Sequence, residues 1–373
     1  MSKQEKNYKG KEHQLFISSV WHWIKLRREN KISPKARKIA RKIFWISFLT
    51  APFRWLQSVI LWFRLPGVSL DEKPPVFVIG HWRSGTTHLH YLLAQDKQFS
   101  FLETFQAFLF RIAFVSKGIM KPILGAVMPT TRPQDNIKID KNSPQEEDHC
   151  LTNISEKSGM QTFYFPNNIS YFDKWNVFKG GVTEKEKNQW KKIYCRMLKQ
   201  IALYQGKDKR LLLKNPNNTG RIEVLLELFA ESKFIFIHRN PYDVYISTKH
   251  LYDSAISSQW LQEFSNEQVE ERVLYIYEES MKTYLEHRSK IPKEHLIEIG
   301  FDELELTAEA TVEKIYTDIS LGDFEAIKPA IAVYLETVKN YKKNKQIQLP
   351  DHIKSQINTR WKFAFEEWGY EME

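Results

Sequence analysis

The sequence predicts an α/β fold, in which helices flank a central parallel sheet and a helical extension precedes it. Three short segments rich in β-branched and aromatic residues predict buried strands, at 76–80, 210–214 and 233–238. Segments with a helical pattern separate them. Strands that alternate with helices are typical of a parallel sheet covered on both faces.

Composition supports a large folded core. The chain has 373 residues, of which 42% are hydrophobic, enough for one large domain with a helical annex. The formal net charge is +10 and the isoelectric point about 9.2, which suits anionic partners or reflects solvated lysines. The two cysteines, Cys150 and Cys195, lack metal-ligand spacing, so neither zinc nor a disulfide framework is expected.

Residues 1–70 form a basic and aromatic extension, and residues 71–373 the main domain. Within it, Pro52, Arg54 and Gln57 interrupt the apolar stretch, so no run reaches the roughly 20 residues of a membrane span. Two amphipathic helices are therefore expected between residues 21 and 65. They either pack on the domain or lie in a membrane interface with basic residues towards the headgroups.

The first residues are polar and charged, unlike a secretory signal. We therefore expect a cytoplasmic protein, attached to a membrane or not.

The elements of the main domain are expected in the following order. The first half has a boundary at 71–75, the strand 76–80, a helix at 86–94, helical character over 99–128, a loop at 132–142, an aromatic lid or acceptor insert at 151–179 and a helix at 184–204. The second half has the strand 210–214, a helix at 221–230, the strand 233–238, a helix at 267–288, a strand at 295–299, and helices near 306–319 and 327–341.

The turn after the first strand predicts a phosphate site. A glycine-containing turn between a strand and a helix directs backbone N–H groups and the positive end of the helix dipole at an anion. The stretch from Gly80 to Thr87 nearly matches the nucleotide-binding pattern G-x-x-x-x-G-K-[ST]. However, Thr86 replaces the lysine, and the cation stands earlier as Arg83. This difference argues against triphosphate hydrolysis, because that lysine reaches the β- and γ-phosphates.

The ends of the other two strands are basic. One ends at Lys214 and the other at His238 and Arg239, where a nucleoside triphosphatase would carry an aspartate for Mg²⁺. Side chains rather than a metal are thus expected to neutralise the ligand. A kinase or nucleoside triphosphatase with a phosphate-binding loop stays an alternative. So does a non-catalytic nucleotide- or RNA-binding module, although the basic residues are concentrated before residue 45 rather than interleaved with aromatics.

Two segments resemble the sulfotransferases. Residues 75–88 are similar to their 5′-phosphosulfate-binding loop, and residues 236–247 to their 3′-phosphate-binding segment. The branch with the sequence Arg-Ser-Gly-Thr-Thr, found in bacteria, is the most similar, and further pieces match it at 132–136, 143–148, 212–216 and 368–370. The resemblance starts near residue 74. It implies the sulfotransferase fold, which is similar to that of phosphate-loop enzymes, and a donor, 3′-phosphoadenosine 5′-phosphosulfate, used without a metal or nucleic acid.

The resemblance also assigns residues. It implies that Arg83 stabilises the departing phosphate, that Lys214 contacts the bridging or sulfuryl oxygens, and that Arg239 and Ser247 hold the 3′-phosphate. Arginine suits this role because it contacts phosphate through two hydrogen bonds. The other donor-binding residues are expected in the loop: Ser84, Gly85, Thr86, Thr87 and His88.

The general base stays open between several groups. Cytosolic sulfotransferases use a His two residues after the lysine, where this chain has Pro216. Tyrosylprotein sulfotransferases use a Glu about twenty residues after the loop arginine, where Glu103 stands. The cluster Glu146, Glu147 and Asp148 is a third candidate, because crowded carboxylates raise at least one pKa.

Three histidines lie in or beside the segments named above, at positions 81, 149 and 238. His81 lies beside the loop and is a further candidate base, because imidazole titrates near neutrality. His149 and His238 are expected to be structural.

Aromatic segments around 99–114 and 163–175 indicate apolar walls for the acceptor. Together with the amphipathic extension, they favour a hydrophobic alcohol, either a sterol or a lipid. A carbohydrate acceptor is the alternative, because sugars also stack on aromatic rings. The oligomeric state is not specified.

Overall fold

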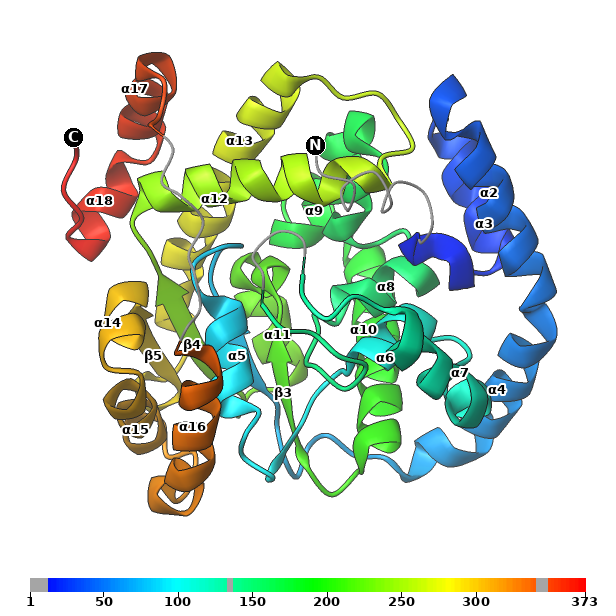
Figure 1. Cartoon of the computed structure of the whole chain (residues 1–373), viewed down its shortest axis with the longest axis horizontal. Coiled ribbons are helices and arrows are strands. Elements are labelled where there is room, and N and C mark those ends of the chain that lie inside the picture. The colour runs from blue at the N-terminus through cyan, green and yellow to red at the C-terminus, as the bar shows by residue number, and fades with distance from the viewer. Residues whose placement is uncertain (1–12, 133–136, 340–347) are drawn as a thin grey trace.

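The computed structural model describes residues 13–132, 137–339 and 348–373, and a parallel sheet of five strands lies at the centre of this part (Figure 1). The strand order is β2-β3-β1-β4-β5, so β1 is central. Val76 of β1 pairs with Leu212 of β3 on one side and with Lys233 of β4 on the other. The strands are β1 (Val76–Ile79), β2 (Phe99–Ser100), β3 (Arg210–Lys214), β4 (Lys233–His238) and β5 (Leu296–Gly300).

Helices make up most of the rest of the described chain. Those before β3 are α2 (Val20–Glu29), α3 (Arg37–Leu49), α4 (Ala51–Arg64), α5 (Thr86–Leu93), α6 (Thr104–Leu109), α7 (Ala113–Val127), α8 (Asp148–Ile154), α9 (Ile169–Val177) and α10 (Glu184–Gln205). Those after β3 are α11 (Ile222–Leu228), α12 (Pro241–Ser254), α13 (Asn266–His287), α14 (Phe301–Leu306), α15 (Ala308–Asp318), α16 (Phe324–Val338), α17 (Asp351–Arg360) and α18 (Lys362–Trp368). A short 3₁₀ helix, η6 (Pro216–Gly220), follows β3.

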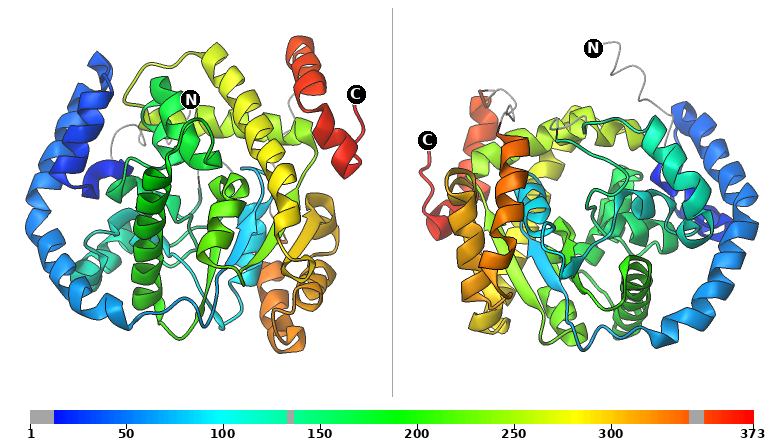
Figure 2. Two further views of the ribbon diagram at one scale, coloured as in Figure 1. Left: turned by 180° about the vertical axis from the view of Figure 1, so that it is seen from behind. Right: turned by 60° about the horizontal axis from the view of Figure 1, so that its bottom comes forward.

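The sheet separates two cores, because successive residues of a strand point to opposite faces. Phe77 and Ile79 pack in the core formed with α10, α11 and α13. Val76 and Val78 pack in the core formed with α5, α15 and α16. The rear view in Figure 2 shows α10 and α13 together on their side of the sheet. Both faces are covered, as the near-continuous apolar strands predicted.

The N-terminal helices curve around the outside of the domain in an arc (Figures 1 and 2). Leu15, Trp23 and Ile43 form a separate small core with side chains of the domain that include Phe165 and Leu261. No single helix of the described chain is long and apolar enough to cross a membrane. One bent pair of helical segments, 34–49 with 51–67, reaches the length and apolarity by composition alone, with a bend of 52°.

Most predicted elements are present, and the differences have local causes. Three helices, not two, occupy residues 21–65, because 30–33 leave the helical conformation and a short 3₁₀ helix at 34–36 precedes α3. The start of the expected helical stretch 99–128 is wrong, since Phe99 pairs with Arg210 as the edge strand β2. Only two residues, Arg239 and Asn240, separate β4 from α12, because Asn240 caps α12 and Pro241 begins it. The helices α17 and α18 were not predicted. Residues 1–12 of the predicted extension, and 133–136 of the segment that resembles the family, lie outside the described residues.

Candidate active site

The turn between β1 and α5 is the segment for which the sequence predicts a phosphate site. Gly85 caps α5 with φ at 96°, and a β-carbon there would overlap the ring of Phe301. Arg83 also has a positive φ, 72°, a conformation that costs a non-glycine residue roughly 1–2 kcal/mol. Such strain concentrates at functional sites. The first N–H groups of α5 have no partner within the helix, which makes its start an anion site.

Thr219 of η6 fixes the beginning of this turn. Its hydroxyl accepts a hydrogen bond from Gly80 N at 2.8 Å and donates one to Gly80 O at 3.0 Å. Gly80 has φ of 139°, and a β-carbon there would overlap Ile237 O. The turn is therefore held in shape by two neighbouring segments of the sheet before any ligand arrives.

Three predicted donor-binding residues lie together beside the turn. Arg83 Nε donates to Ser247 Oγ at 2.8 Å, and Arg239 Nη1 donates to Arg83 O at 3.2 Å. Asp243 holds the Arg239 guanidinium at 3.1 Å, and Phe301 lies under it with 4.4 Å between Cζ and the ring centroid. Ser247 stands on the second turn of α12. The helix therefore presents a hydroxyl from its side, next to a fixed guanidinium.

A second group of charges gathers around Thr87, on the first turn of α5. Lys214 Nζ lies 3.4 Å from Thr87 Oγ1 and 2.5 Å from Glu146 Oε1. Arg132 Nη1 lies 3.5 Å from the same threonine hydroxyl. Burial lowers the pKa of Lys214; Glu146 acts in the opposite direction, and Arg132 lowers the pKa further. A buried ammonium, a guanidinium and one carboxylate thus meet at the start of α5.

Glu147 points away from this cluster although it follows Glu146 directly. It is fully buried and accepts hydrogen bonds from Tyr194 Oη at 2.8 Å, Asn215 Nδ2 at 3.1 Å and Asn218 Nδ2 at 2.7 Å. Burial, and next the charge of Asp148, raise its pKa. A carboxylate enclosed in this way holds η6 in place. Of the two neighbouring candidate bases, the buried Glu147 lies away from the cluster around Thr87, and Glu146 lies within it.

Asp148 completes the same internal network. Arg221 donates to both of its oxygens at 2.9 Å, and both side chains are fully buried. Removing one partner of such a buried pair costs about 3–5 kcal/mol. The acidic cluster therefore divides into one carboxylate at the site and two that anchor the segment after β3.

The backbone of Glu103 lies near the site, but its carboxylate is paired with Lys121. The residue forms an antiparallel bridge with Pro144, two residues before Glu146. Both of its oxygens accept from Lys121 Nζ at 2.8 Å, and the side chain is 7% exposed. Glu103 remains a candidate base only if a substrate displaces Lys121.

The histidines near the loop are buried. His81 Nδ1 contacts Trp82 O at 2.9 Å, the ring lies against Tyr277, and burial lowers its pKa to about 3. It is only 1% exposed, which removes it from contact with an acceptor. His88 faces Tyr334, with 3.4 Å between Nδ1 and Oη, and burial lowers its pKa as well. It points towards α16 rather than into the cluster around Lys214.

Arg132 and Phe301 are site residues that the sequence reasoning missed. Arg132 stood in a segment that resembles the family, so a signal existed, but no role was assigned to it. Phe301 begins α14, far along the chain from Gly85 and Arg239, and its sequence context gave no signal. Many of the expected acceptor walls are core instead, namely Phe105, Phe110, Tyr164, Phe165, Phe172 and Trp175.

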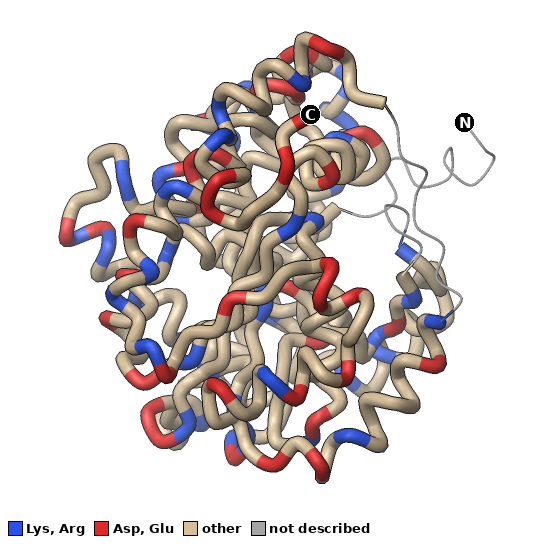
Figure 3. Tube along the Cα trace, turned by 90° about the vertical axis from the view of Figure 1, so that its left-hand side faces the viewer, with Lys and Arg blue, Asp and Glu red and all other residues tan. Residues whose placement is uncertain are grey.

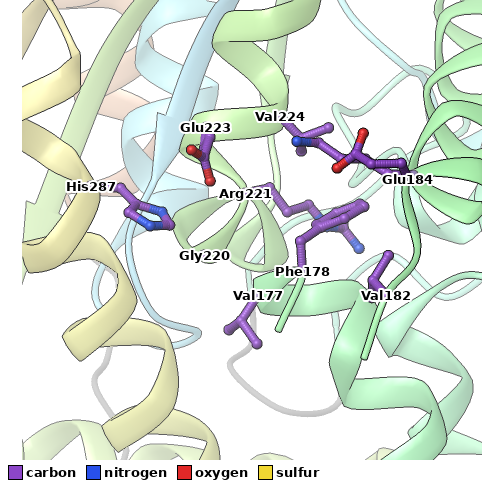
Figure 4. Close-up of a pocket in the computed structure, with 10 residues that line it drawn as sticks. Val177, Phe178, Val182, Glu184, Gly220, Arg221, Glu223, Val224 and His287 are labelled. Atoms are coloured by element: carbon purple, nitrogen blue, oxygen red, sulfur yellow. The ribbon is translucent and has the colours of Figure 1, made fainter. Parts of the chain in front are cut away.

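A cavity of about 310 Å³ lies outside this site (Figure 4). Arg221, Glu223 and His287 line it together with Phe178, and none of the predicted donor-binding residues does. Within the described ranges, no group of three or more His, Cys, Asp and Glu side chains is placed to hold a metal ion.

The geometry defines a class: a parallel α/β protein with cationic side chains gathered around the turn between its central strand and α5. The model of the sulfotransferase family matches residues 74–325, and the chain belongs to this family. The omega-hydroxy-beta-dihydromenaquinone-9 sulfotransferase Stf3 of Mycobacterium bovis is 27% identical over 353 residues, which cover 95% of this chain and 89% of the relative. The Stf3 of Mycobacterium tuberculosis has the same identity and coverage.

Solved structures agree with the fold. Sulfotransferase STF1 from Mycobacterium tuberculosis has a TM-score of 0.65 at 18% identity, covering 91% of this chain and 90% of STF1. Sulfotransferase STF9 from Mycobacterium avium has a TM-score of 0.59 at 16% identity, covering 96% of this chain and 98% of STF9. The predicted α/β class and the predicted enzyme family are thereby confirmed.

Proposed function

We propose that the protein transfers a sulfuryl group from 3′-phosphoadenosine 5′-phosphosulfate to the hydroxyl of a hydrophobic alcohol of the lipid type. The observation that carries the proposal is the pair of cationic groups at the two ends of one loop. Lys214 meets Thr87 at the start of α5, and Arg239 with Ser247 meets Arg83. Two separated anion sites fit a donor with two separated phosphates.

The donor is held by fixed positive charge. The 5′-phosphosulfate would lie against the N–H groups of the first turn of α5, next to Thr86 and Thr87. The 3′-phosphate would replace contacts that Arg83 and Arg239 now make with Ser247 and with the loop backbone. Asp243 and Phe301 keep the Arg239 guanidinium oriented, so little conformational entropy is lost when the phosphate binds.

Transfer requires one proton acceptor and one stabiliser of the leaving group. The acceptor oxygen forms a bond to sulfur while the bond from sulfur to the 5′-phosphate oxygen breaks, so the 5′-phosphate of the departing 3′-phosphoadenosine 5′-phosphate gains one negative charge. Lys214 and Arg83 stabilise that charge where it develops. Glu146 takes the hydroxyl proton once the incoming sulfuryl group has drawn Lys214 away from it.

The acceptor is proposed from chemistry shared with a relative. Stf3 is named for a hydroxylated menaquinone, which is a long apolar alcohol. The short segment after α7 brings Arg132 to Thr87, and the exposed apolar residues Ile119, Ile123 and Val127 lie on α7 itself. An apolar approach to the donor loop suits a lipid alcohol better than a sugar.

Thermal unfolding with nucleotides tests the donor. Ligands that bind the native state raise its stability by mass action. We expect 3′-phosphoadenosine 5′-phosphate to raise Tm, while ADP and ATP with Mg²⁺ leave it nearly unchanged. Stabilisation by ATP equal to or above that of the 3′-phosphorylated nucleotide would exclude the proposal and favour a kinase or nucleoside triphosphatase.

A further inference from the structure

An extensive apolar surface covers the helices α3, α4 and α7, on the outer arc of the domain (Figure 1). We call it the aromatic face. Trp55 and Phe63 are each 70% exposed and Trp62 is 68% exposed. Single exposed apolar residues are ordinary, but a contiguous group marks an interaction site. Its members are Trp45, Phe48, Leu49, Phe53, Trp55, Leu56, Val59, Trp62, Phe63, Ile119, Ile123 and Val127.

The distribution of polar and aromatic side chains on α4 is the reverse of that on a helix at a water-facing surface. Its buried residues are the polar Arg54 and Gln57 together with Leu61, while its aromatic residues are exposed. Gln57 Nε2 donates to Phe110 O at 2.8 Å, and its Oε1 accepts from Phe114 N at 2.9 Å, which joins α4 to the start of α7. Arg54 donates to Thr50 Oγ1 and to Ser47 O. Both polar side chains of the inner side thus bind protein groups, and the aromatic outer side has no such partners in these contacts.

Positive charge is concentrated around the same helices. Residues 20–65 contain eleven Lys and Arg and a single acid, Glu29, a balance of +10 that equals the net charge of the whole chain. Lys38 and Lys42 are exposed on α3, and within the described residues neither takes part in an ion pair. By contrast, acidic and basic residues are interspersed over the face that carries α14 to α18 (Figure 3).

We propose that the aromatic face inserts into the interface of a membrane that contains anionic lipids, with the basic residues of α3 at the headgroups. Tryptophan prefers the boundary between headgroups and acyl chains, and lysine and arginine are attracted to an anionic surface. A membrane span does not fit, because Ala40 and Ile43 pack into the small N-terminal core and Gln57 binds the domain. One side of each helix therefore stays on protein while the other enters lipid.

The aromatic face lies close to the donor loop along the chain. Arg132, which contacts Thr87 of the donor loop, is the fifth residue after Val127 of the aromatic face. Five residues span at most about 18 Å. A lipid alcohol whose chain remains in the bilayer could thus present its hydroxyl to the donor. This delivery step rests on the proposed function, whereas the docking itself does not.

Flotation of the full chain with vesicles tests the docking. We expect binding to vesicles of phosphatidylcholine with phosphatidylglycerol, and weak binding to phosphatidylcholine alone. The pair Trp55→Ser and Trp62→Ser should lower the partition coefficient about tenfold or more, because two large apolar side chains no longer enter the interface. The matched control is Leu306→Ser with Val333→Ser, which changes side chains that are 82% and 69% exposed elsewhere and should leave binding unaltered.

Substitution of exposed lysines distinguishes docking to anionic lipid from non-specific adhesion of apolar side chains. Lys38→Gln with Lys42→Gln should weaken binding to anionic vesicles by roughly fivefold for each residue. The equivalent change at Lys314 and Lys362 should have no effect, because those lysines are exposed on α15 and α18. Thermal unfolding shows that each variant is folded.

Two outcomes would overturn the proposal. The first is that the double variant Trp55→Ser with Trp62→Ser floats with anionic vesicles as well as the wild type does. The other is a concentration-dependent dimer that the tryptophan pair abolishes while neither protein binds vesicles, which would make the aromatic face a contact between copies of the chain. Failure of docking leaves the donor test intact, and turnover of a short soluble alcohol separates the two questions.

Discussion

The ion pair between Lys214 and Glu146 makes the sharpest prediction about the site. In the proposed mechanism the two residues act separately, the lysine on the leaving group and the glutamate on the acceptor proton. Lys214→Met keeps the length of the side chain and removes its charge, and Glu146→Gln keeps an oxygen and removes its basicity. Each variant tests one role.

The expected magnitudes follow from burial. The side chain of Lys214 is 4% exposed and that of Glu146 is 15% exposed, so the lysine acts in a water-poor site. Removal of one preorganised stabiliser of transition-state charge costs about 10²–10³ in kcat, and loss of a general base about 10²–10⁴. Donor affinity should change little for Glu146→Gln. It should fall for Lys214→Met, because a cation near the phosphosulfate is lost.

The same pair predicts a coupling in stability. Glu146→Gln leaves the buried ammonium with only a neutral acceptor, which should cost about 1–3 kcal/mol of unfolding free energy. The double variant removes the buried charge as well and should recover part of that loss, with a coupling of about 0.5–3 kcal/mol. Urea unfolding of the four proteins measures this coupling.

Activity should also fall at high pH before a free lysine would titrate. Burial lowers the pKa of Lys214, so the required ammonium is lost as pH rises through a value below its usual 10.5. Glu146 raises that pKa, and therefore Glu146→Gln should move the alkaline limb of kcat to lower pH. Lys214→Arg should move it upward, because arginine keeps its charge. The reasoning is refuted if kcat of Glu146→Gln is near normal, or if the two single changes in stability simply add.

Three further predictions concern the donor loop and the N-terminal helices. Arg239→Ala should reduce the preference for 3′-phosphoadenosine 5′-phosphate over adenosine 5′-phosphate by roughly 10–150-fold, since a charge-assisted contact contributes about 1.5–3 kcal/mol. Calorimetry gives the Kd values of both nucleotides, and an unchanged ratio would contradict the role assigned to Arg239. Gly85→Ala should lower Tm and abolish nucleotide binding, because the new methyl group overlaps Phe301 at a φ of 96°; normal binding by fluorescence titration would mean that the loop adapts. His22 binds Thr152 O at 2.9 Å, and burial lowers its pKa to about 4. Below pH 6.5 His22 is therefore protonated in the unfolded chain but stays neutral in the folded chain until about pH 4. The free energy of unfolding should fall by up to roughly 3 kcal/mol as pH falls from 6.5 to 4. His22→Gln should flatten this slope in denaturant titrations, and an equally steep slope would show that other groups dominate it.

The sheet could be predicted because its strands are defined locally. Each of β1, β3 and β4 is a short apolar run between turn residues, and burial on both faces requires that composition. The strand β2 could not be predicted in this way. It has two residues, Phe99 and Ser100, and becomes a strand only because β3 offers a free edge.

The clustering of the candidate donor-binding residues could be predicted because parallel strands end at a common edge. Lys214 ends β3 and Arg239 follows β4, the two neighbours of β1, so both side chains reach the segment that follows β1. Phe301 could not be found, since only the packing of α14 brings its ring to Arg239 and Gly85. Tertiary structure, not sequence pattern, sets that contact.

The carboxylates show the same limit at finer scale. Glu146 and Glu147 are chemically identical neighbours in the sequence, yet one meets Lys214 and the other is enclosed by Tyr194 and two asparagines. Likewise, the amphipathic pattern of α4 was evident, but not that its polar side faces inwards. The orientation of α4 depends on groups that its polar side chains bind, such as the backbone of Phe110 and Phe114, which lie far along the chain.

Transfer of radiolabelled sulfate from 3′-phosphoadenosine 5′-phosphosulfate to a long-chain alcohol tests the central claim most directly. The wild type should give a labelled sulfate ester in the presence of anionic vesicles and without added nucleoside triphosphate, and Lys214→Met should give about 10²–10³-fold less. No labelled lipid ester from the folded wild type, alongside efficient labelling of a glycan, would contradict the proposed acceptor. Equal labelling by wild type and Lys214→Met would contradict the proposed site.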